Sequence, residues 1–318
     1  MKQRPLGNTG IRVSEIAFGG VEIGLPYGIG VKSEADMLSQ SEAICLLHSA
    51  IDSGVNFFDT ARLYGASEAI MGEAFKGRRE RVVISTKCRH FRDENGNLPE
   101  AKRLKEIIEA SLHESLTALQ TDFVDVYMLH QADVEILERE EIARTFLNLK
   151  KQGVIRATGV STYRTEETEK AITSGVWDVV QVPFNLMDQS HGALFPVAAR
   201  HGVGIVVRSV LFKGILSEKG RNLHPALRDV ERHLTHYQEL LGPKIPNLPT
   251  LAMKFALSFE AVSSVLVGID RLEYLRQALA AADGEYLDEK MLARARALRY
   301  PQPEFLDLVK WDRKGWLR

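Results

Sequence analysis

Cysteine is scarce in this chain of 318 residues, which contains only Cys45 and Cys88. Two thiols are too few for a disulfide framework, and they lie too far from other ligand types to form a zinc site. Cys88 directly follows Lys87, and a neighbouring cation can lower the pKa of a thiol. We favour the simpler interpretation, in which Cys88 is a small buried residue, and we expect no metal site.

Long apolar runs and blocks of like charge are also missing. No stretch of about 18 apolar residues occurs, so we expect no transmembrane helix. The first residues, Met-Lys-Gln-Arg-Pro-Leu-Gly, lack the apolar centre of a signal peptide. The 41 basic and 42 acidic residues are interspersed and give a net charge of −1. This balance argues against nucleic-acid and membrane partners, and a cytoplasmic protein fits it best.

No Gly-x-Gly-x-x-Gly motif follows a strand, which disfavours an open dinucleotide-binding sheet. The chain instead alternates strand-like and helix-like runs, and eight strand-like runs can be counted. They cover residues 16–20, 56–59, 82–87, 123–130, 158–161, 179–184, 204–210 and 263–268. Such alternation is typical of a closed (β/α)8 barrel or of an open doubly wound sheet.

Helix-like runs separate these strands, at residues 41–53, 67–75, 100–119, 134–151, 165–174, 194–201 and 272–282. Several of them end at a glycine, namely at Gly54, Gly153, Gly175 and Gly202. Glycine at this place favours a left-handed cap that leads into the next strand. Thr165 is expected to cap its helix, with Glu166 and Glu167 in the first turn.

Three further segments complete the expected architecture. Asn8-Thr9-Gly10 is a turn signal and predicts a short N-terminal β-hairpin. The long segment from Leu211 to about Leu248 follows the seventh strand and is expected to act as a cofactor clamp or a substrate lid. The tail over residues 308–316 carries two tryptophans outside any regular helix pattern, and it could close the barrel mouth or pack on the barrel's side.

Polar residues stand where three apolar strands end. Asp59 ends the run 56–59, Lys87 ends 82–87 and His130 ends 123–130, while Tyr64 follows Asp59 closely. The carboxyl ends of parallel strands meet at one rim, where barrel active sites lie. A phenol can donate a proton to a forming alkoxide if a cation lowers its pKa, and Lys87 is the available cation. The pattern therefore favours an α/β protein with a single (β/α)8 barrel domain over residues 1–318.

In this order and context, the four residues resemble the Asp, Tyr, Lys, His tetrad of the aldo-keto reductase family, and the resemblance covers essentially the whole chain. It implies a (β/α)8 TIM barrel that interconverts an aldehyde or ketone and its alcohol with a nicotinamide cofactor. Tyr64 would be the general acid/base, assisted by Lys87, Asp59 and His130. The stretch 263–268 also looks like family members that oxidise free sugars.

The resemblance also implies contacts with the nicotinamide. Ser161 and Thr162 stand where the family places Ser and Asn on the carboxamide, and Thr162 lacks the amide. Gln181 matches the carboxamide-binding Gln, and a polar residue inside an apolar strand needs a partner in any case. Arg208 and Ser209 end the seventh strand, where the family stacks a side chain, often aromatic, on the ring. A guanidinium can stack as well.

The remaining cofactor contacts are implied for the pyrophosphate and the adenosine. They are Gly20, Asp59, Leu211, Lys213, Gly214, Gly268, Asp270, Arg271, Tyr274 and Gln277. The lysine and arginine that often meet a 2′-phosphate in the family are missing. Asp270 would repel that phosphate, whereas Arg271 could bind it. NADP and NAD are therefore both candidate cofactors.

The substrate pocket is expected to use the loop 21–32, residues after Lys87 and the tail, and to take a small-molecule carbonyl or alcohol. Two rival functions stay open at this point. The first is a lyase in which Lys87 forms a Schiff base, although Asp59 nearby would keep Lys87 protonated. The second is a redox-sensing or regulatory barrel that binds the cofactor and turns over negligibly.

Overall fold

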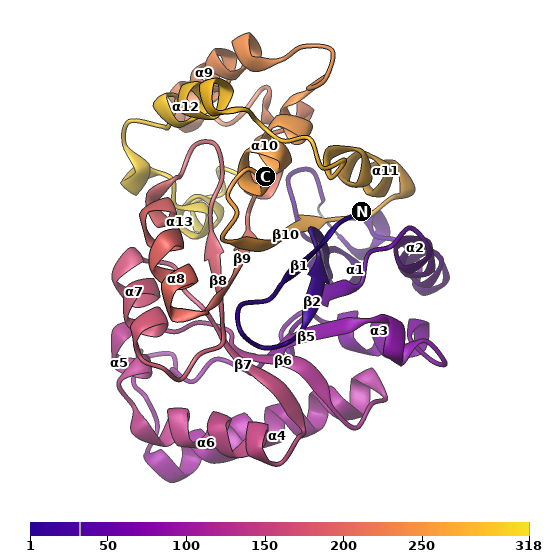
Figure 1. Cartoon of the computed structure of the whole chain (residues 1–318), viewed down its shortest axis with the longest axis vertical. Helices are drawn as coiled ribbons and strands as arrows, with labels where there is room; N and C mark the ends of the chain where they lie inside the picture. Colours follow the sequence, from indigo (N-terminus) through magenta and orange to yellow (C-terminus); the bar gives the residue numbers. More distant parts are fainter. Residues whose placement is uncertain (32, 318) are drawn as a thin grey trace.

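The structure is a computed structural model that describes residues 1–31 and 33–317. Within this part of the chain, eight parallel strands close into a barrel in the order β10-β3-β4-β5-β6-β7-β8-β9 (Figure 1). The strands are β3 (Ile16–Gly19), β4 (Phe57–Asp59), β5 (Val83–Lys87), β6 (Val124–Leu129), β7 (Ile155–Ser161), β8 (Val179–Pro183), β9 (Gly204–Arg208) and β10 (Val262–Gly268). The predicted closed barrel is confirmed, and the open sheet is excluded.

Helices surround the barrel (Figure 1). They are α1 (Val21–Gly24), α2 (Gln40–Asp52), α3 (Ser67–Ala74), α4 (Ala101–Leu119), α5 (Val134–Leu137), α6 (Glu140–Lys151), α7 (Thr165–Thr173), α8 (Phe195–His201), α9 (Arg228–Leu234), α10 (Leu248–Leu257), α11 (Leu272–Ala281), α12 (Glu289–Ala297) and α13 (Leu308–Arg313). The glycines expected at helix ends, Gly54, Gly153, Gly175 and Gly202, all have positive φ, as the left-handed caps require.

Two helix predictions were wrong in detail. The expected helix 134–151 is interrupted, because Arg139 adopts φ −77° and ψ 103° and a new helix begins at Glu140. Thr165 does not cap α7; the N-cap residue is Arg164. The Glu167 side chain accepts hydrogen bonds from the backbone amides of Tyr163 (2.8 Å) and Arg164 (2.9 Å). The carboxylate thus binds the two amides just before α7, whereas a Thr165 cap would have accepted from amides inside the first turn.

An antiparallel hairpin of β1 (Gln3–Pro5) and β2 (Arg12–Ser14) confirms the predicted N-terminal turn. Three of its apolar residues, Leu6, Ile11 and Val13, belong to the same buried cluster as the side chains inside the barrel. The amide of Asn8 bonds to the Gly202 carbonyl just before β9, so the hairpin covers the end where the strands begin. The opposite end, where the strands finish, is not covered by this hairpin.

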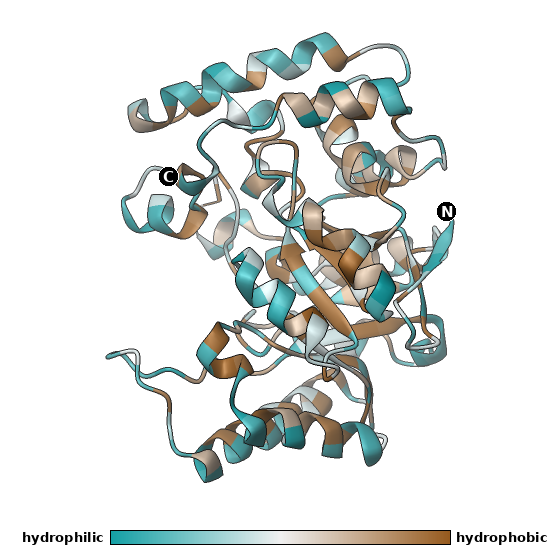
Figure 2. Ribbon diagram, turned by 60° about the vertical axis from the view of Figure 1, so that its left-hand side comes forward, coloured by the Kyte–Doolittle hydropathy of each residue, from teal (hydrophilic) through white to brown (hydrophobic). Residues whose placement is uncertain are grey.

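A second and larger core lies between the strands and the surrounding helices. Figure 2 shows brown, apolar strands at the centre and helices whose outward surfaces are largely teal. The strands are buried on both faces, which explains their near-continuous runs of apolar residues. Among the described residues, no helix has both the length and the apolar character that crossing a membrane requires.

Candidate active site

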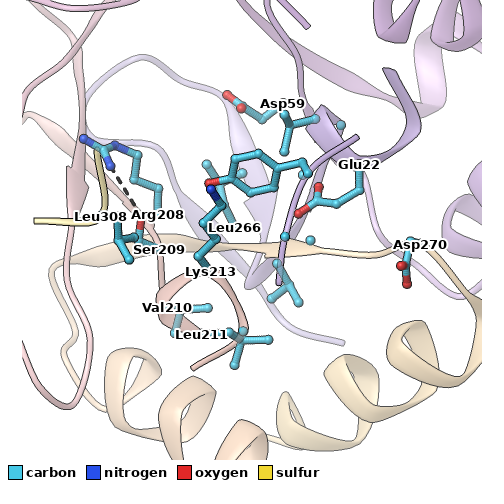
Figure 3. Close-up of a pocket in the computed structure, with 18 of the residues that line it drawn as sticks. Glu22, Asp59, Arg208, Ser209, Val210, Leu211, Lys213, Leu266, Asp270 and Leu308 are labelled. Atoms are coloured by element: carbon cyan, nitrogen blue, oxygen red, sulfur yellow. Dashed lines mark hydrogen bonds between the residues drawn. The ribbon is translucent and has the colours of Figure 1, made fainter. Parts of the chain in front are cut away.

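A cavity of about 810 Å³ opens at the carboxyl end of the barrel (Figure 3). Most of the residues predicted from the sequence line its wall. They are Gly20, Asp59, Tyr64, His130, Ser161, Gln181, Arg208, Ser209, Leu211, Lys213, Gly214, Gly268, Asp270, Tyr274 and Gln277. Because these residues come from most of the strand ends, closure of the barrel gathers them into one elongated site.

Asp59 is fixed by partners on both carboxylate oxygens. The Lys87 ammonium donates to Oδ2 at 2.5 Å and to the Thr60 carbonyl at 3.0 Å. The Gln181 amide donates to Oδ1 at 2.9 Å, and this is the partner that a polar residue inside β8 required. Lys87 is fully buried and lies behind the cavity wall rather than in it. Burial lowers the pKa of Lys87, and the Asp59 carboxylate opposes that shift.

Tyr64 stands between two of its expected partners. The Lys87 Nζ lies 4.9 Å from the centroid of the Tyr64 ring, and the His130 ring meets it edge-on at 5.4 Å. Burial raises the pKa of Tyr64 above the ordinary phenol value, Asp59 adds to the shift, and Arg208 opposes it. The ammonium is therefore next to the phenol as expected, but the phenol in the free protein is a weaker acid than usual.

His130 is a neutral imidazole near neutral pH. Burial lowers its pKa to about 2, and the Lys87 charge adds to that effect. Its Nδ1 atom is buried and has no hydrogen-bond partner among the described residues. The ring of His90 lies 4.9 Å away, centroid to centroid. A neutral imidazole can donate from one nitrogen only, so the tautomer decides which side of the ring is the donor.

A model of the aldo/keto reductase family matches residues 15–299 of this chain. The chain belongs to the aldo-keto reductase family. The uncharacterized oxidoreductase YqkF of Bacillus subtilis is 28% identical over 303 residues, which cover 91% of this chain and 94% of that protein. The L-galactose dehydrogenase of Arabidopsis thaliana is 28% identical over 323 residues and 94% of each chain. A solved aldo-keto reductase of Bacillus halodurans in its holo form superposes with a TM-score of 0.79 at 26% identity, covering 94% of this chain and 96% of that one.

The end of the site where an aldo-keto reductase would hold the nicotinamide contains one departure from expectation. Ser161 and Gln181 line the cavity, but the Thr162 hydroxyl does not. It faces the Thr168 hydroxyl on α7 at 2.6 Å, and only the carbonyl of Thr162 turns toward Arg208, accepting from Nη2 at 3.0 Å. Threonine lacks the longer amide side chain of asparagine, so the Thr162 hydroxyl pairs with the nearby Thr168 hydroxyl instead.

Arg208 is held flat beside the cavity. Its Cζ lies 4.3 Å from the centroid of the Tyr163 ring, and Nη1 is 3.4 Å from the Ser209 hydroxyl (Figure 3). Its Nε is buried without a partner among the described residues. The guanidinium is thus oriented by the protein before any ligand arrives, which lowers the entropic cost of binding one. Tyr163 carried no signal in the sequence beyond its place next to Thr162.

The segment after β9 has an unusual backbone. Ser209, Phe212 and Lys213 have φ of 58°, 49° and 57°, the left-handed region that side chains disfavour. The Lys213 ammonium pairs with Asp312 of α13 at 3.3 Å and lies 5.1 Å from the centroid of the Tyr27 ring. Such local strain is typical of functional sites. The early loop, this segment and the C-terminal helix therefore meet at Lys213.

The opposite end of the cavity, expected to hold the adenosine, is lined by Asp270, Tyr274 and Gln277. Arg271 does not line it, because its guanidinium turns back: Nε donates to Asp270 Oδ1 at 3.1 Å, and Cζ lies 4.9 Å from the centroid of the Tyr274 ring. Glu22, which was expected only as a member of the substrate-side loop 21–32, also lines the cavity. The only sequence signal for it was a charged residue in an apolar stretch directly after a strand end.

The substrate-side expectations are met in part. Of the loop 21–32, the cavity is lined by Val21, Glu22, Tyr27 and Gly28, and Lys32 lies outside the described residues. Residues directly after Lys87 do not reach the wall. Burial raises the pKa of the Cys88 thiol to about 12, so the neighbouring Lys87 does not activate it.

The C-terminal tail, residues 308–316, forms part of the cavity wall instead of packing on the side of the barrel. The structure contradicts the expected lack of helix, because Leu308–Arg313 form α13. Four of its residues, Leu308, Val309, Asp312 and Arg313, line the cavity. Trp311 is fully buried, 5.5 Å from the Phe212 ring, and so anchors α13 to the segment after β9.

The residues present fit a nicotinamide dinucleotide on two observations. The volume lies within the range of about 300–1,000 Å³ usual for small-molecule sites. The wall also carries buried polar atoms that have no partner among the described residues, Glu22 Oε2, His130 Nδ1 and Arg208 Nε. Buried polar groups are normally satisfied, so these atoms indicate a polar ligand that supplies the missing hydrogen bonds.

Proposed function

We propose that this aldo-keto reductase is an NAD(P)-dependent oxidoreductase that interconverts an aldehyde or ketone and its alcohol, with Tyr64 as the general acid/base. The observation that carries the proposal is the packing at one end of the cavity. The Lys87 ammonium, bound by Asp59, lies 4.9 Å from the centroid of the Tyr64 ring, and His130 contacts the same ring. This packing places the proton donor, Tyr64, close to the fixed positive charge of Lys87 at the mouth of the barrel.

The roles of the residues follow from their protonation. The bound nicotinamide supplies the hydride in the reductive direction. Tyr64 gives its proton to the carbonyl oxygen as negative charge develops there, and the phenolate left behind faces the Lys87 charge. Because burial raises the pKa of Tyr64, the phenol keeps its proton at neutral pH. An acid that is fully protonated before reaction suits carbonyl reduction better than alcohol oxidation.

His130 and Asp59 act on the same atoms in different ways. As a neutral imidazole, His130 can donate one N–H to the carbonyl oxygen and hold it beside the Tyr64 hydroxyl. Asp59 positions Lys87, because its Oδ2 accepts from the Lys87 ammonium while its Oδ1 accepts from the Gln181 amide. A Schiff base on Lys87 is disfavoured by the same bonds and by its place behind the cavity wall.

The cofactor contacts we propose run along the cavity. Ser161 and Gln181 would meet the carboxamide, Arg208 the ring, and Lys213 and Gly214 the pyrophosphate. The adenosine end supports NAD over NADP, because Asp270 lies in the wall and its carboxylate already engages Arg271, the cation that could bind a 2′-phosphate. The likeness to an L-galactose dehydrogenase supports including sugars among the candidate substrates.

Binding and turnover test the proposal in sequence. Titration of the intrinsic tryptophan fluorescence with NADH and NADPH measures cofactor affinity. A panel of aldehydes, ketones and free sugars, followed at the cofactor absorbance, then measures turnover. We expect Tyr64→Phe to abolish most turnover and to leave cofactor affinity nearly unchanged. Wild-type turnover in this variant would refute Tyr64 as the acid, and a wild type that binds neither cofactor would refute the function.

A further inference from the structure

Glu22 is a carboxylic side chain in the cavity that has no assigned role. It lies on the short helix α1, directly after β3. Its Oε2 is buried and has no partner among the described residues. On its other side Oε1 lies against the end of β10, so close that a Cβ on Gly268 would come within 1.9 Å of it. The absence of a side chain at Gly268 is therefore what leaves room for this carboxyl group.

The charges around Glu22 are mainly negative. Asp270 at the end of β10 and Asp59 on β4 both act on it, and the Lys219 ammonium in the segment after β9 opposes them. The phenols of Tyr27 and Tyr64 lie within its electrostatic reach as well. On the neighbouring helix α3, the Glu68 carboxylate is bound by Arg62. Burial first, and then Asp270, raise the pKa of Glu22 to about 8, so the group is mostly protonated at neutral pH.

Glu22 lies between the two ends of the cavity. Figure 3 shows its side chain between Asp59 at the reaction end and Asp270 at the nucleotide end. Any dinucleotide that spans these ends passes Glu22 with its ribose and pyrophosphate. A carboxylate there would repel phosphate oxygens at short range, whereas a carboxylic acid donates a hydrogen bond to an oxygen acceptor.

We propose that Glu22 is a cofactor-binding residue that works as a neutral acid, so that cofactor binding above neutral pH takes up a proton at this side chain. The inference rests on the proposed function and adds a residue to it. A dianionic pyrophosphate beside the group favours the protonated form still more, so affinity is highest where Glu22 is already neutral. As the pH rises past that range, each binding event must first return a proton to Glu22.

Isothermal titration calorimetry of the wild-type protein with NADH and with NAD⁺ tests this. Titrations at pH 9 in two buffers of different ionisation enthalpy count the protons taken up. We expect an uptake that approaches one proton for wild type, and an affinity that falls by up to about tenfold per pH unit between pH 8 and 10. Glu22→Gln keeps the shape and the donor but cannot titrate. It should retain the wild-type affinity at pH 6.5 and show no uptake.

A second variant tests whether Asp270 contributes to the raised pKa of Glu22. Asp270→Asn removes the negative charge that acts most strongly on Glu22 and should move the pH at which uptake begins to a lower value, while the uptake itself persists. Equal uptake in wild type and Glu22→Gln would overturn the assignment, and so would a pH-independent wild-type affinity. These outcomes differ from failure of the proposed function, in which wild-type protein binds no nicotinamide dinucleotide at any pH.

Discussion

The Lys87 ammonium lies 4.9 Å from the centroid of the Tyr64 ring. The same ammonium is bound to Asp59 at 2.5 Å. The Asp59 carboxylate thus fixes the position of the Lys87 ammonium, and the positive charge of the ammonium acts on the Tyr64 ring. In the free protein this arrangement leaves the phenol protonated, and the positive charge becomes useful only when the phenol gives its proton away.

The Lys87–Asp59 pair predicts that removing one charge destabilises the fold more than removing both. Lys87→Met leaves the Asp59 carboxylate buried with only Gln181 as a partner, and we expect a loss of about 3–5 kcal/mol in the free energy of unfolding. The double variant Lys87→Met/Asp59→Asn removes both charges and should recover part of that loss. Urea unfolding followed by circular dichroism measures each value. Additive losses in the double variant would contradict a direct charge pair.

Arg208 predicts a difference between the two redox forms of the cofactor. Its guanidinium is oriented by Tyr163 and by the Thr162 carbonyl before a ligand binds. The oxidised nicotinamide ring is a cation and the reduced ring is neutral, so a fixed positive charge at the ring favours the reduced form. Replacement by Tyr keeps a planar surface and removes the charge.

We therefore expect wild type to bind NADH more tightly than NAD⁺, and Arg208→Tyr to narrow that ratio by about tenfold, or about 1.4 kcal/mol. Fluorescence titration of both proteins with both forms measures the ratio. Arg208→Lys, which keeps the charge, is the matched control and should preserve most of the preference. An unchanged ratio in Arg208→Tyr would show that the guanidinium does not face the ring.

The barrel and the polar residues at its strand ends followed from local sequence, whereas most of the cofactor contacts were implied by the family resemblance. Most strands were recognisable as apolar runs, although β7 begins at Ile155 instead of the expected residue 158. Asp59, Lys87 and His130 could be recognised because each stands at or directly after a strand end. Parallel closure then brought these ends together without any further information. The hairpin and the left-handed helix caps were equally local, since turn residues and glycines determine them.

The residues that sequence reasoning missed depend on contacts between distant parts of the chain. Glu22 faces Gly268 only because β10 pairs with β3 when the barrel closes. The Thr162 hydroxyl was lost from the site because Thr168, one helix turn into α7, is its nearer partner. Trp311 is buried by Phe212, so the position of α13 could not be derived from either segment alone.

Asp270 predicts a change in cofactor choice. Its carboxylate binds Arg271 at 3.1 Å and contributes negative charge to the cavity wall. Asp270→Ser removes that charge and frees the guanidinium. We expect the affinity for NADPH to rise about fivefold, the effect of roughly 1 kcal/mol for a partly exposed charge pair. NADH affinity should change much less.

Fluorescence titration with NADH and NADPH measures both effects of Asp270→Ser. The double variant Asp270→Ser/Arg271→Gln is the control, because it lacks the freed cation and should lose most of the gain. If NADPH affinity is unchanged in Asp270→Ser, the carboxylate does not face the 2′-position of the ribose.

His130 predicts how stability depends on pH. Its folded-state pKa of about 2 lies below the ordinary histidine value near 6.5, so in acid the unfolded chain binds a proton that the folded chain excludes. The stabilisation from this group is complete above pH 6.5 and declines as the pH falls, by at most about 1.4 kcal/mol per pH unit. His191 contributes in the same direction, because burial lowers its pKa to about 4. Urea unfolding at pH 7.0, 6.0 and 5.0 should therefore show a shallower decline for His130→Gln than for wild type, with His191 unchanged in both. Parallel declines would mean that His130 accepts a proton in the folded protein, and a neutral imidazole at the carbonyl oxygen would then have to be abandoned.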